Sequence, residues 1–347
     1  MRSRVFSCAL LLLSIAASGA AEAQQGPAPA SSPTGTANLS SAAITSGAGS
    51  ASVSAPTTTV IFYTAITASI ARHFEPSYVT FGGGYNTRSG VLGGNDLLYE
   101  AQVYVHYTWN DTSLRKKPEQ GADLVRIMVP IRLQVRQYAS ESSPVRTPSY
   151  NPGFRMYYTR GSWSDEDRLF YLSAGLHHYS NGQSGPHYNP DGKINTENGS
   201  FSTDYAELTL YWDRKSSWTR FNIRKYLIGG IATWEPEQSH YYEKALAEIA
   251  WRQDFGSFGL ARETMSVQLT AGYKFNRDYI SPGVNASLRD NLQWTAEATI
   301  PIDLFLPEKH WQDMRFYVRG DLGYDYYNIH YQEKLQRIHA GFVATNF

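Results

Sequence analysis

The 347-residue sequence has one cysteine, no net charge and no long apolar run beyond its N-terminus. The cysteine, Cys8, lies in a segment where Arg2 and Arg4 precede an apolar run, and Ala21-Glu22-Ala23 provides a small-residue cleavage site. Residues 1–23 are therefore predicted to be a secretory signal peptide. The mature chain then has no thiol, which excludes disulfides, cysteine–metal sites and cysteine catalysis.

Acidic and basic residues balance at 31 each, so charge gives no reason to expect binding to nucleic acid or electrostatic adhesion to a membrane. The mean hydropathy is −0.41, and no later stretch reaches the roughly 18 apolar residues of a spanning helix. These absences exclude a helical membrane protein. They still allow a membrane β-barrel, whose short segments of alternating polarity produce no hydropathy peak.

Residues 24–59 consist mainly of Ala, Ser, Gly, Thr and Pro and contain no charged residue. Such a composition has too few large apolar groups to offset the entropy of ordering, and it predicts a flexible leader. Residues 60–347 are then the expected barrel domain. Its first part, 60–71, is apolar but too short to span as a helix, and it could be an interior plug, a short helix or a first strand.

Alternation of apolar and polar residues marks the rest of the chain. Between 123 and 138 the two phases carry Val125, Ile127, Val129, Ile131, Leu133 and Val135 on one side and Arg126, Met128, Arg132, Gln134 and Arg136 on the other. Segments 264–274 and 291–302 alternate in the same way, and about twelve such segments can be counted. The predicted fold class is all-β, an antiparallel transmembrane β-barrel of about 12 strands, of the bacterial outer-membrane type. We also expect a bulge at Pro130, which cannot donate to a ladder.

A soluble sandwich or a lipocalin-like barrel would alternate similarly. The signal peptide, the absence of mature cysteines and the terminal Phe347 favour the membrane barrel. The predicted location is the bacterial outer membrane.

The segment His178-Tyr179-Ser180-Asn181-Gly182 carries the clearest chemical signal. Counting back by twos from Ser180 gives His178, Leu176, Ala174, Leu172 and Phe170, so a base and a hydroxyl share the apolar, lipid-facing phase of a strand. Ser-Asn-Gly alone is an ordinary turn sequence. An imidazole within hydrogen-bonding reach of a serine, however, is what activation of a serine nucleophile requires, which predicts a hydrolase acting at a membrane.

Together with two further segments, these residues resemble the outer membrane phospholipase A family. The resemblance is carried by the His-x-Ser-Asn-Gly segment, by the run from Glu141 to Pro152 with its Ser142-Ser143-Pro144, and by the aromatic C-terminal region from Ala296 with Pro301. It implies that Ser180 is the nucleophile and His178 the general base.

The third catalytic residue departs from the family pattern, because Ser202 stands where family members have an asparagine, after an enlarged loop. The apolar phase of the next segment, Ala206 and Leu208, extends backwards to Asp204 and Ser202. Since a carboxylate orients an imidazolium better than a hydroxyl does, Asp204 is preferred, with Ser202 or Asn198 as alternatives.

The resemblance also implies activation by Ca²⁺ at the interface of a homodimer. Ser142 matches a hydroxyl supplied from the partner chain, and the carbonyl of Gln183 matches a carbonyl ligand. Ser200 or Asn198 could complete the set, because hydroxyl and carbonyl oxygens suit this cation.

The expected function is therefore hydrolysis of acyl ester bonds of glycerophospholipids, with phospholipase A1 and A2 activities, in the outer membrane. One alternative is a lipid A deacylase, a shorter kind of barrel that also uses His-x-Ser. A second is a catalytically inactive pore or structural barrel, whose channel the arginine-rich phase of 123–138 could line.

Overall fold

The computed structural model describes residues between 68 and 344, with gaps. The described residues are 68–82, 84–86, 91–95, 97–113, 123–138, 145–160, 168–227, 242–256, 265–275, 291–302, 314–331 and 333–344. The predicted signal peptide, the predicted leader, Ser142 and Phe347 lie outside them.

Most of the described residues are in β-strands. The strands are β1 (Ser77–Phe81), β2 (Gly84–Asn86), β3 (Val91–Asn95), β4 (Leu97–Ser113), β5 (Asp123–Tyr138), β6 (Ser149–Arg160), β7 (Arg168–Ser180), β8 (Ser202–Arg214), β9 (Ser217–Leu227), β10 (Ala245–Phe255), β11 (Met265–Phe275), β12 (Leu292–Pro301), β13 (Met314–Tyr324) and β14 (Lys334–Ala344). A 3₁₀ turn, η6 (Asn328–His330), precedes β14. No helix in the described part of the chain is long and apolar enough to cross a membrane.

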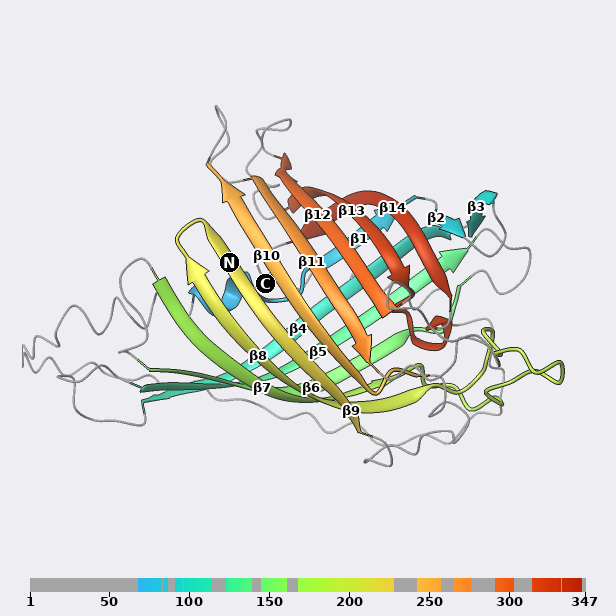
Figure 1. Ribbon diagram of the computed structural model, residues 1–347, viewed down its shortest axis with the longest axis horizontal. Helices are drawn as coiled ribbons and strands as arrows, with labels where there is room; N and C mark the ends of the chain where they lie inside the picture. The colour runs from blue at the N-terminus through green and yellow to red at the C-terminus, as the bar shows by residue number, and fades with distance from the viewer. Residues whose placement is uncertain are drawn as a thin grey trace, which may run out of the picture. The chain divides into compact units, whose positions relative to one another are not determined.

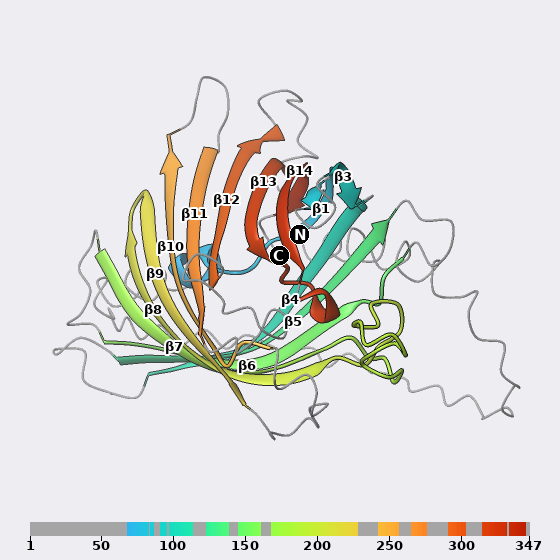
Figure 2. The ribbon, with the colours of Figure 1, turned by 45° about the vertical axis from the view of Figure 1, so that its right-hand side comes forward.

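The strands form a closed antiparallel barrel (Figures 1 and 2). Sequential neighbours pair from β4 to β14, and β1 closes the sheet by pairing with both β4 and β14. The short β2 continues β1 along β14 and forms a hairpin with β3. Twelve strands therefore surround the barrel, which confirms the predicted fold class. Closure removes the exposed edges that an open sheet would present.

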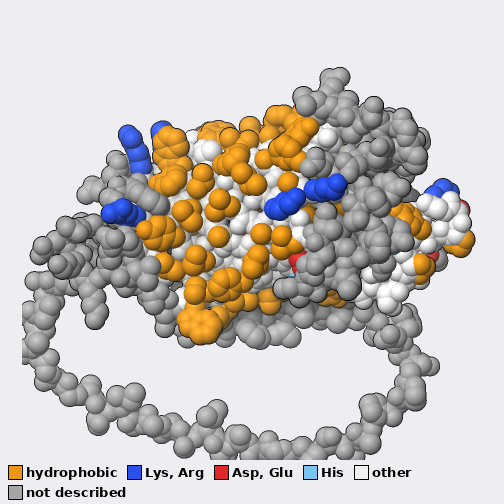
Figure 3. Space-filling view, turned by 60° about the horizontal axis from the view of Figure 1, so that its bottom comes forward, with side chains coloured by type: hydrophobic (Ala, Val, Ile, Leu, Met, Phe, Trp, Pro, Cys, Tyr) orange, Lys and Arg blue, Asp and Glu red, His pale blue; other side chains and the backbone are white. Residues whose placement is uncertain are grey.

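The two faces of the strands follow the predicted alternation. In β8 the side chains of Leu208, Leu210 and Trp212 are exposed, while those of Thr209 and Tyr211 between them are buried in the barrel. Apolar side chains are spread over the described part of the outer face in Figure 3, with few charged ones among them. A surface that exposes large apolar groups outwards and buries polar ones inwards suits a lipid surrounding rather than water.

Pro130 causes no bulge, contrary to the sequence-based expectation. β5 pairs with β4 in continuous register through the His106–Pro130 position. On its other side the register with β6 is the same before and after Pro130, but no pairing is formed at Val129 and Pro130. The missing donor is therefore accommodated by a local gap in the ladder, opposite a strand that carries Pro152 nearby.

Buried ion pairs cross-link the inside of the barrel. Glu100, which is fully buried, accepts hydrogen bonds from Arg136 Nε at 2.6 Å and Arg337 Nη1 at 3.0 Å. Its second oxygen accepts from Tyr78 and Tyr326. Burial raises the pKa of Tyr326 to about 12, so this phenol stays protonated as a donor. A buried carboxylate with this many partners is compensated for its loss of water.

The described chain begins with a helical turn, residues 68–72, that lies inside the barrel. Ser69 donates to Asp213 at the end of β8, and His73 Nε2 lies 2.7 Å from the same carboxylate. Arg72 pairs with Asp254 at the end of β10, at 2.6 Å. Of the segment 60–71, residues 60–67 lie outside the described residues, and 68–71 belong to this helical turn, which agrees with the expectation of a short helix or an interior plug.

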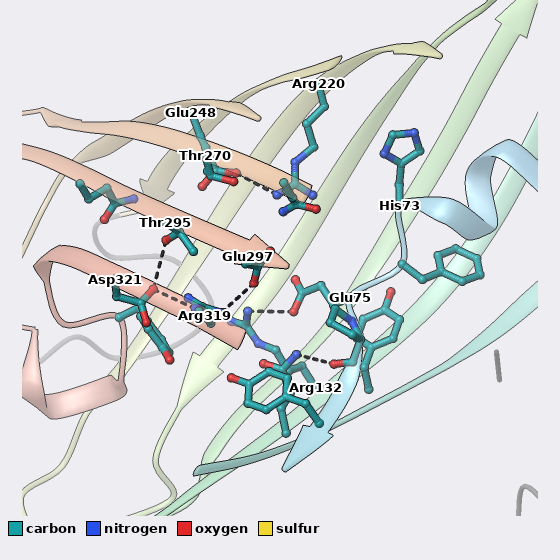
Figure 4. Close-up of a pocket in the computed structure, with 18 of the residues that line it drawn as sticks. His73, Glu75, Arg132, Arg220, Glu248, Thr270, Thr295, Glu297, Arg319 and Asp321 are labelled. Atoms are coloured by element: carbon teal, nitrogen blue, oxygen red, sulfur yellow. Dashed lines mark hydrogen bonds and ion pairs between the residues drawn. The ribbon is translucent and has the colours of Figure 1, made fainter. Parts of the chain in front are cut away.

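Aromatic side chains gather at the opposite end of the barrel, where β7 meets the following loop. This cluster comprises Tyr179, Phe201, Tyr205, Tyr226, Tyr242, Leu246, Ile329 and Tyr331. Between it and the helical turn lies a polar cavity of about 580 Å³. Its charged side chains pair with each other, as Arg132 does with Glu75 and Arg220 with Glu248, both at 3.0 Å (Figure 4).

Candidate functional site

Strand β7 places His178 and Ser180 on the outer face of the barrel. The residues between and before them, Tyr179 and His177, are buried inside, whereas Leu176 on the outer face is 56% exposed. The sequence thus alternates polar or aromatic luminal residues with an apolar outer stripe, and the two polar groups end that stripe. His178 and Ser180 lie at the end of the strand, close to the rim of the barrel.

Strand β8 presents Asp204 directly to His178. In the antiparallel register His178 pairs with Asp204, and Ser180 pairs with Ser202. The Nδ1 atom of His178 lies 2.8 Å from Asp204 Oδ1. The imidazole side chain is 42% exposed and the carboxylate only 9% exposed. The structure therefore brings Asp204, rather than Ser202, to the predicted base.

This contact determines which imidazole nitrogen is available for chemistry. An ionised carboxylate can only accept hydrogen bonds, so Nδ1 of His178 carries the hydrogen that it donates to Asp204. The lone pair of the neutral ring is then on Nε2. The Ser180 hydroxyl, one position along the same face, forms no hydrogen bond with any described residue. Nε2 and this hydroxyl are the two groups left to act together.

The backbone beneath the His178–Asp204 pair is held from inside the barrel. His177 stacks on Tyr205 with ring centroids 4.9 Å apart, and these two residues are also register partners. The ring of His177 fills the space beside Gly153, where an added Cβ would lie 2.1 Å from Nδ1. The guanidinium carbon of Arg224 lies over the Tyr205 ring, 4.5 Å from its centroid. Such packing restricts movement of the two strands that carry the outer pair.

Loop 181–201 begins with an asparagine, Asn181, whose sequence context indicates only a turn. Asn181 is 1% exposed, and its side chain bonds to Gly199, Gln183 and Phe201. The signal available in the sequence was the Asn of Ser-Asn-Gly, but its distant partners could not be predicted without the folded loop.

Of the residues predicted as metal ligands, Gln183, Ser200 and the alternative Asn198 are described, and all three belong to this loop. Gln183 is exposed and Ser200 is half-buried. Neither the Ser200 hydroxyl nor the Gln183 carbonyl forms a hydrogen bond within the described chain. Asn198 is different, because its Oδ1 accepts from Asn195 at 2.6 Å and its carbonyl accepts from Gly185. The free hydroxyl and carbonyl oxygens are ligands that suit Ca²⁺.

A second group of metal-type ligands lies at the same rim. Ligand atoms of Asp325, His330 and Glu333 all lie within 4.8 Å of one another. Arg136 already binds both oxygens of Asp325, at 2.6 and 2.9 Å, and His330 Nδ1 lies 3.0 Å from Glu333. A guanidinium paired with the carboxylate repels a cation, so we interpret this group as an ion-pair network.

The fold and the site together define the class: a closed antiparallel barrel with an apolar outside and a polar inside is of the outer-membrane type. Solved structures with a similar fold include the Salmonella typhi outer membrane phospholipase, crystallised as a dimer with bound calcium. It shows a TM-score of 0.50 and 14% identity, over 78% of this chain and 90% of that one.

Outer membrane phospholipase A from Escherichia coli gives a TM-score of 0.48, with the same identity and coverage. BamA from Haemophilus ducreyi gives 0.33, at 12% identity over 82% of this chain and 78% of its own. No protein-family model and no curated protein matches the sequence. At these identities the comparisons show the fold alone.

Proposed function

We propose that this barrel hydrolyses acyl ester bonds of glycerophospholipids at the surface of the outer membrane. The observation that carries the proposal is the 2.8 Å hydrogen bond between His178 and Asp204 on the lipid-facing surface, with Ser180 next on the same face. A buried catalytic centre would require a lipid to leave the membrane. This site needs only lateral diffusion of the substrate.

The reaction follows from the state of these groups. Ser180 Oγ attacks the ester carbonyl while His178 Nε2 removes its proton, and Asp204 stabilises the imidazolium that forms. The imidazolium then returns the proton to the leaving alcohol, so that an acyl-serine remains. Water, deprotonated by the same nitrogen, attacks the acyl group, and the imidazolium gives that proton to Ser180 Oγ as the fatty acid is released.

The site belongs near the membrane boundary rather than the bilayer centre. On the lipid face, an arginine or lysine at mid-bilayer costs about 2–4 kcal/mol and an acidic residue somewhat less, and the cost falls near the interface. Asp204 is the third residue of β8, and His178 is two residues from the end of β7. Both therefore lie close to the rim, which is where the ester groups of a lipid would be.

Calcium fits the donors that the loop offers. The residues that would hold it are Ser200 through its hydroxyl, Gln183 through its carbonyl, and Ser142 of the partner subunit, as the family resemblance implies. The chemistry that the cation supplies when bound is stabilisation of negative charge on the ester oxygen. A site shared between two chains would make the active form a homodimer.

The paired charges of the lumen argue against the pore alternative. The helical turn occupies one end and the aromatic cluster the other, and Arg132 and Arg220 are neutralised by Glu75 and Glu248. This interior is more simply a hydrogen-bonded packing of polar groups than a selective channel.

The test is release of fatty acid from phospholipid in mixed micelles by the refolded protein, with calcium or with chelator. We expect calcium-dependent release that Ser180→Ala abolishes. Ser202→Ala is the matched control, because Ser202 faces Ser180 across the strands and forms no hydrogen bond with His178, whose Nδ1 is bonded to Asp204. A well-folded wild type that releases no fatty acid from phospholipid, but does so from lipid A, would replace this proposal with the deacylase alternative.

A further inference from the structure

Asn181 connects the two ends of loop 181–201 through its side chain. Its Nδ2 group donates to the Gly199 carbonyl at 2.7 Å. Its Oδ1 atom accepts from the backbone N–H of Gln183 at 3.2 Å and from that of Phe201 at 3.0 Å. Its own backbone N–H donates to the Phe201 carbonyl at 3.0 Å. With 1% of its surface exposed, the side chain has little access to water as a substitute partner.

Only one of these bonds is explained by the turn itself. A bond from an asparagine Oδ1 to the N–H two residues later is the usual Asx turn, here followed by Gly182 in the left-handed region at φ +65°. The bonds to Gly199 and Phe201 reach across 18 and 20 residues. They connect the start of the loop with its end.

The residues connected in this way flank the oxygens assigned above to the cation. Gln183 is bonded directly, and Ser200 lies between the two bonded residues at the other end of the loop. The Ser200 backbone is further held by Gly185, at 2.8 Å, and by His187 Nδ1, at 3.1 Å from its carbonyl. His187 is 4% exposed and contacts Tyr331 through Nε2 at 3.1 Å. Several hydrogen bonds therefore hold the backbone of the loop in place around the proposed ligands.

We infer that Asn181 is a positioning residue for the cation site, setting the separation between the Gln183 carbonyl and the Ser200 hydroxyl. This inference rests on the proposed function, because it assumes the cation site of that proposal. Without the Asn181 side chain, the two ends of the loop would keep only the backbone bond to Phe201 as their connection at this point. Binding of the cation would then have to order the two ligand oxygens. The free energy that this ordering costs lowers the affinity for the cation, as expected when a site loses its preorganisation.

The experiment compares Asn181→Ala and Asn181→Asp with wild type in refolded full-length protein. Terbium chloride is the probe for direct binding, followed by its luminescence, and fatty-acid release measures the calcium concentration for half-maximal activity. Asn181→Ala should raise both midpoints at least tenfold while leaving the maximal rate at saturating calcium within a few-fold of wild type. Asn181→Asp keeps the two accepted bonds and loses the donor, so it should give a smaller rise.

Asn189→Ala is the matched control, since Asn189 is an exposed residue of the same loop with no side-chain hydrogen bond among the described residues. Its midpoints should equal those of wild type. Heat-dependent gel mobility measures the folded fraction, and if Asn181→Ala does not fold, Asn181→Asp decides the question. Midpoints of the folded variants equal to wild type would overturn the inference while leaving a calcium-dependent phospholipase intact. A wild type that hydrolyses no phospholipid and binds no terbium would overturn both.

Discussion

Two residues of β8, Asp204 and Ser202, lie on the same outer face as His178, and the strand register determines which of them is opposite the imidazole. Asp204 is opposite it and bonded to Nδ1, whereas Ser202 is opposite Ser180. In the proposed mechanism, a carboxylate in this position would keep the ring in the tautomer with a free Nε2 and would stabilise the imidazolium that forms. Ser202 can do neither from its register position.

The register predicts that Asp204 is the third residue of the proposed catalytic triad. Asp204→Ala should lower kcat by about 10²- to 10⁴-fold, because the imidazole loses the group that orients it. Ser202→Ala should leave kcat nearly unchanged. Steady-state hydrolysis of phospholipid in mixed micelles measures both, and a loss caused by Ser202→Ala but not by Asp204→Ala would show that the serine is the third member.

Among the elements, the strands were the part that sequence could predict well. The alternation in 123–138 and 291–302 corresponds to β5 and β12, with the predicted faces inside and outside. Side chains in a strand have a period of two whatever the fold around them, so the faces of His178 and Asp204 followed from counting. That His178 and Asp204 lie directly opposite each other could not be predicted in this way. The register of β7 and β8 depends on the fold of loop 181–201, and counting alternate residues does not determine it.

Other local features depend on partners far away in the chain and could not be predicted. The helical turn 68–72 binds Asp213 and Asp254, more than 140 residues later. Asn181 looked like an ordinary turn residue because its bond to Gly199 exists only in the folded loop. At Pro130 the expected bulge was wrong, since a gap in the ladder accommodates the missing donor without a change of register.

The strands β4, β5 and β14 are connected inside the barrel by Glu100. Glu100→Ala would leave the guanidinium of Arg337, and part of that of Arg136, buried without this carboxylate. Removing one partner of a buried ion pair costs about 3–5 kcal/mol, so the free energy of unfolding in urea should fall by that order.

The control for this prediction is Glu248→Ala, which breaks the partly exposed pair with Arg220, whose side chains are 24% and 17% exposed. It should cost at most about 1 kcal/mol. Equal losses for the two variants would contradict the assignment of Glu100 as a central cross-link of the barrel.

For the whole molecule, a cation site shared between chains predicts an association that depends on calcium. In detergent micelles the protein should sediment as a monomer with chelator and as a dimer with calcium. Ser142→Ala should weaken the dimer, because the partner's ligand is lost. Sedimentation velocity measures the two masses, and a mass that does not respond to calcium would contradict the shared site.

The occupied ends of the barrel have a consequence for the cell that carries it. A cavity of about 580 Å³ holds on the order of twenty water molecules, but solutes meet the helical turn at one end and the aromatic cluster at the other. At the outer-membrane location proposed above, many copies would therefore not make the envelope leaky to solutes. Planar bilayers containing the protein should show no stepwise current, and cells overproducing Ser180→Ala should keep their normal antibiotic resistance.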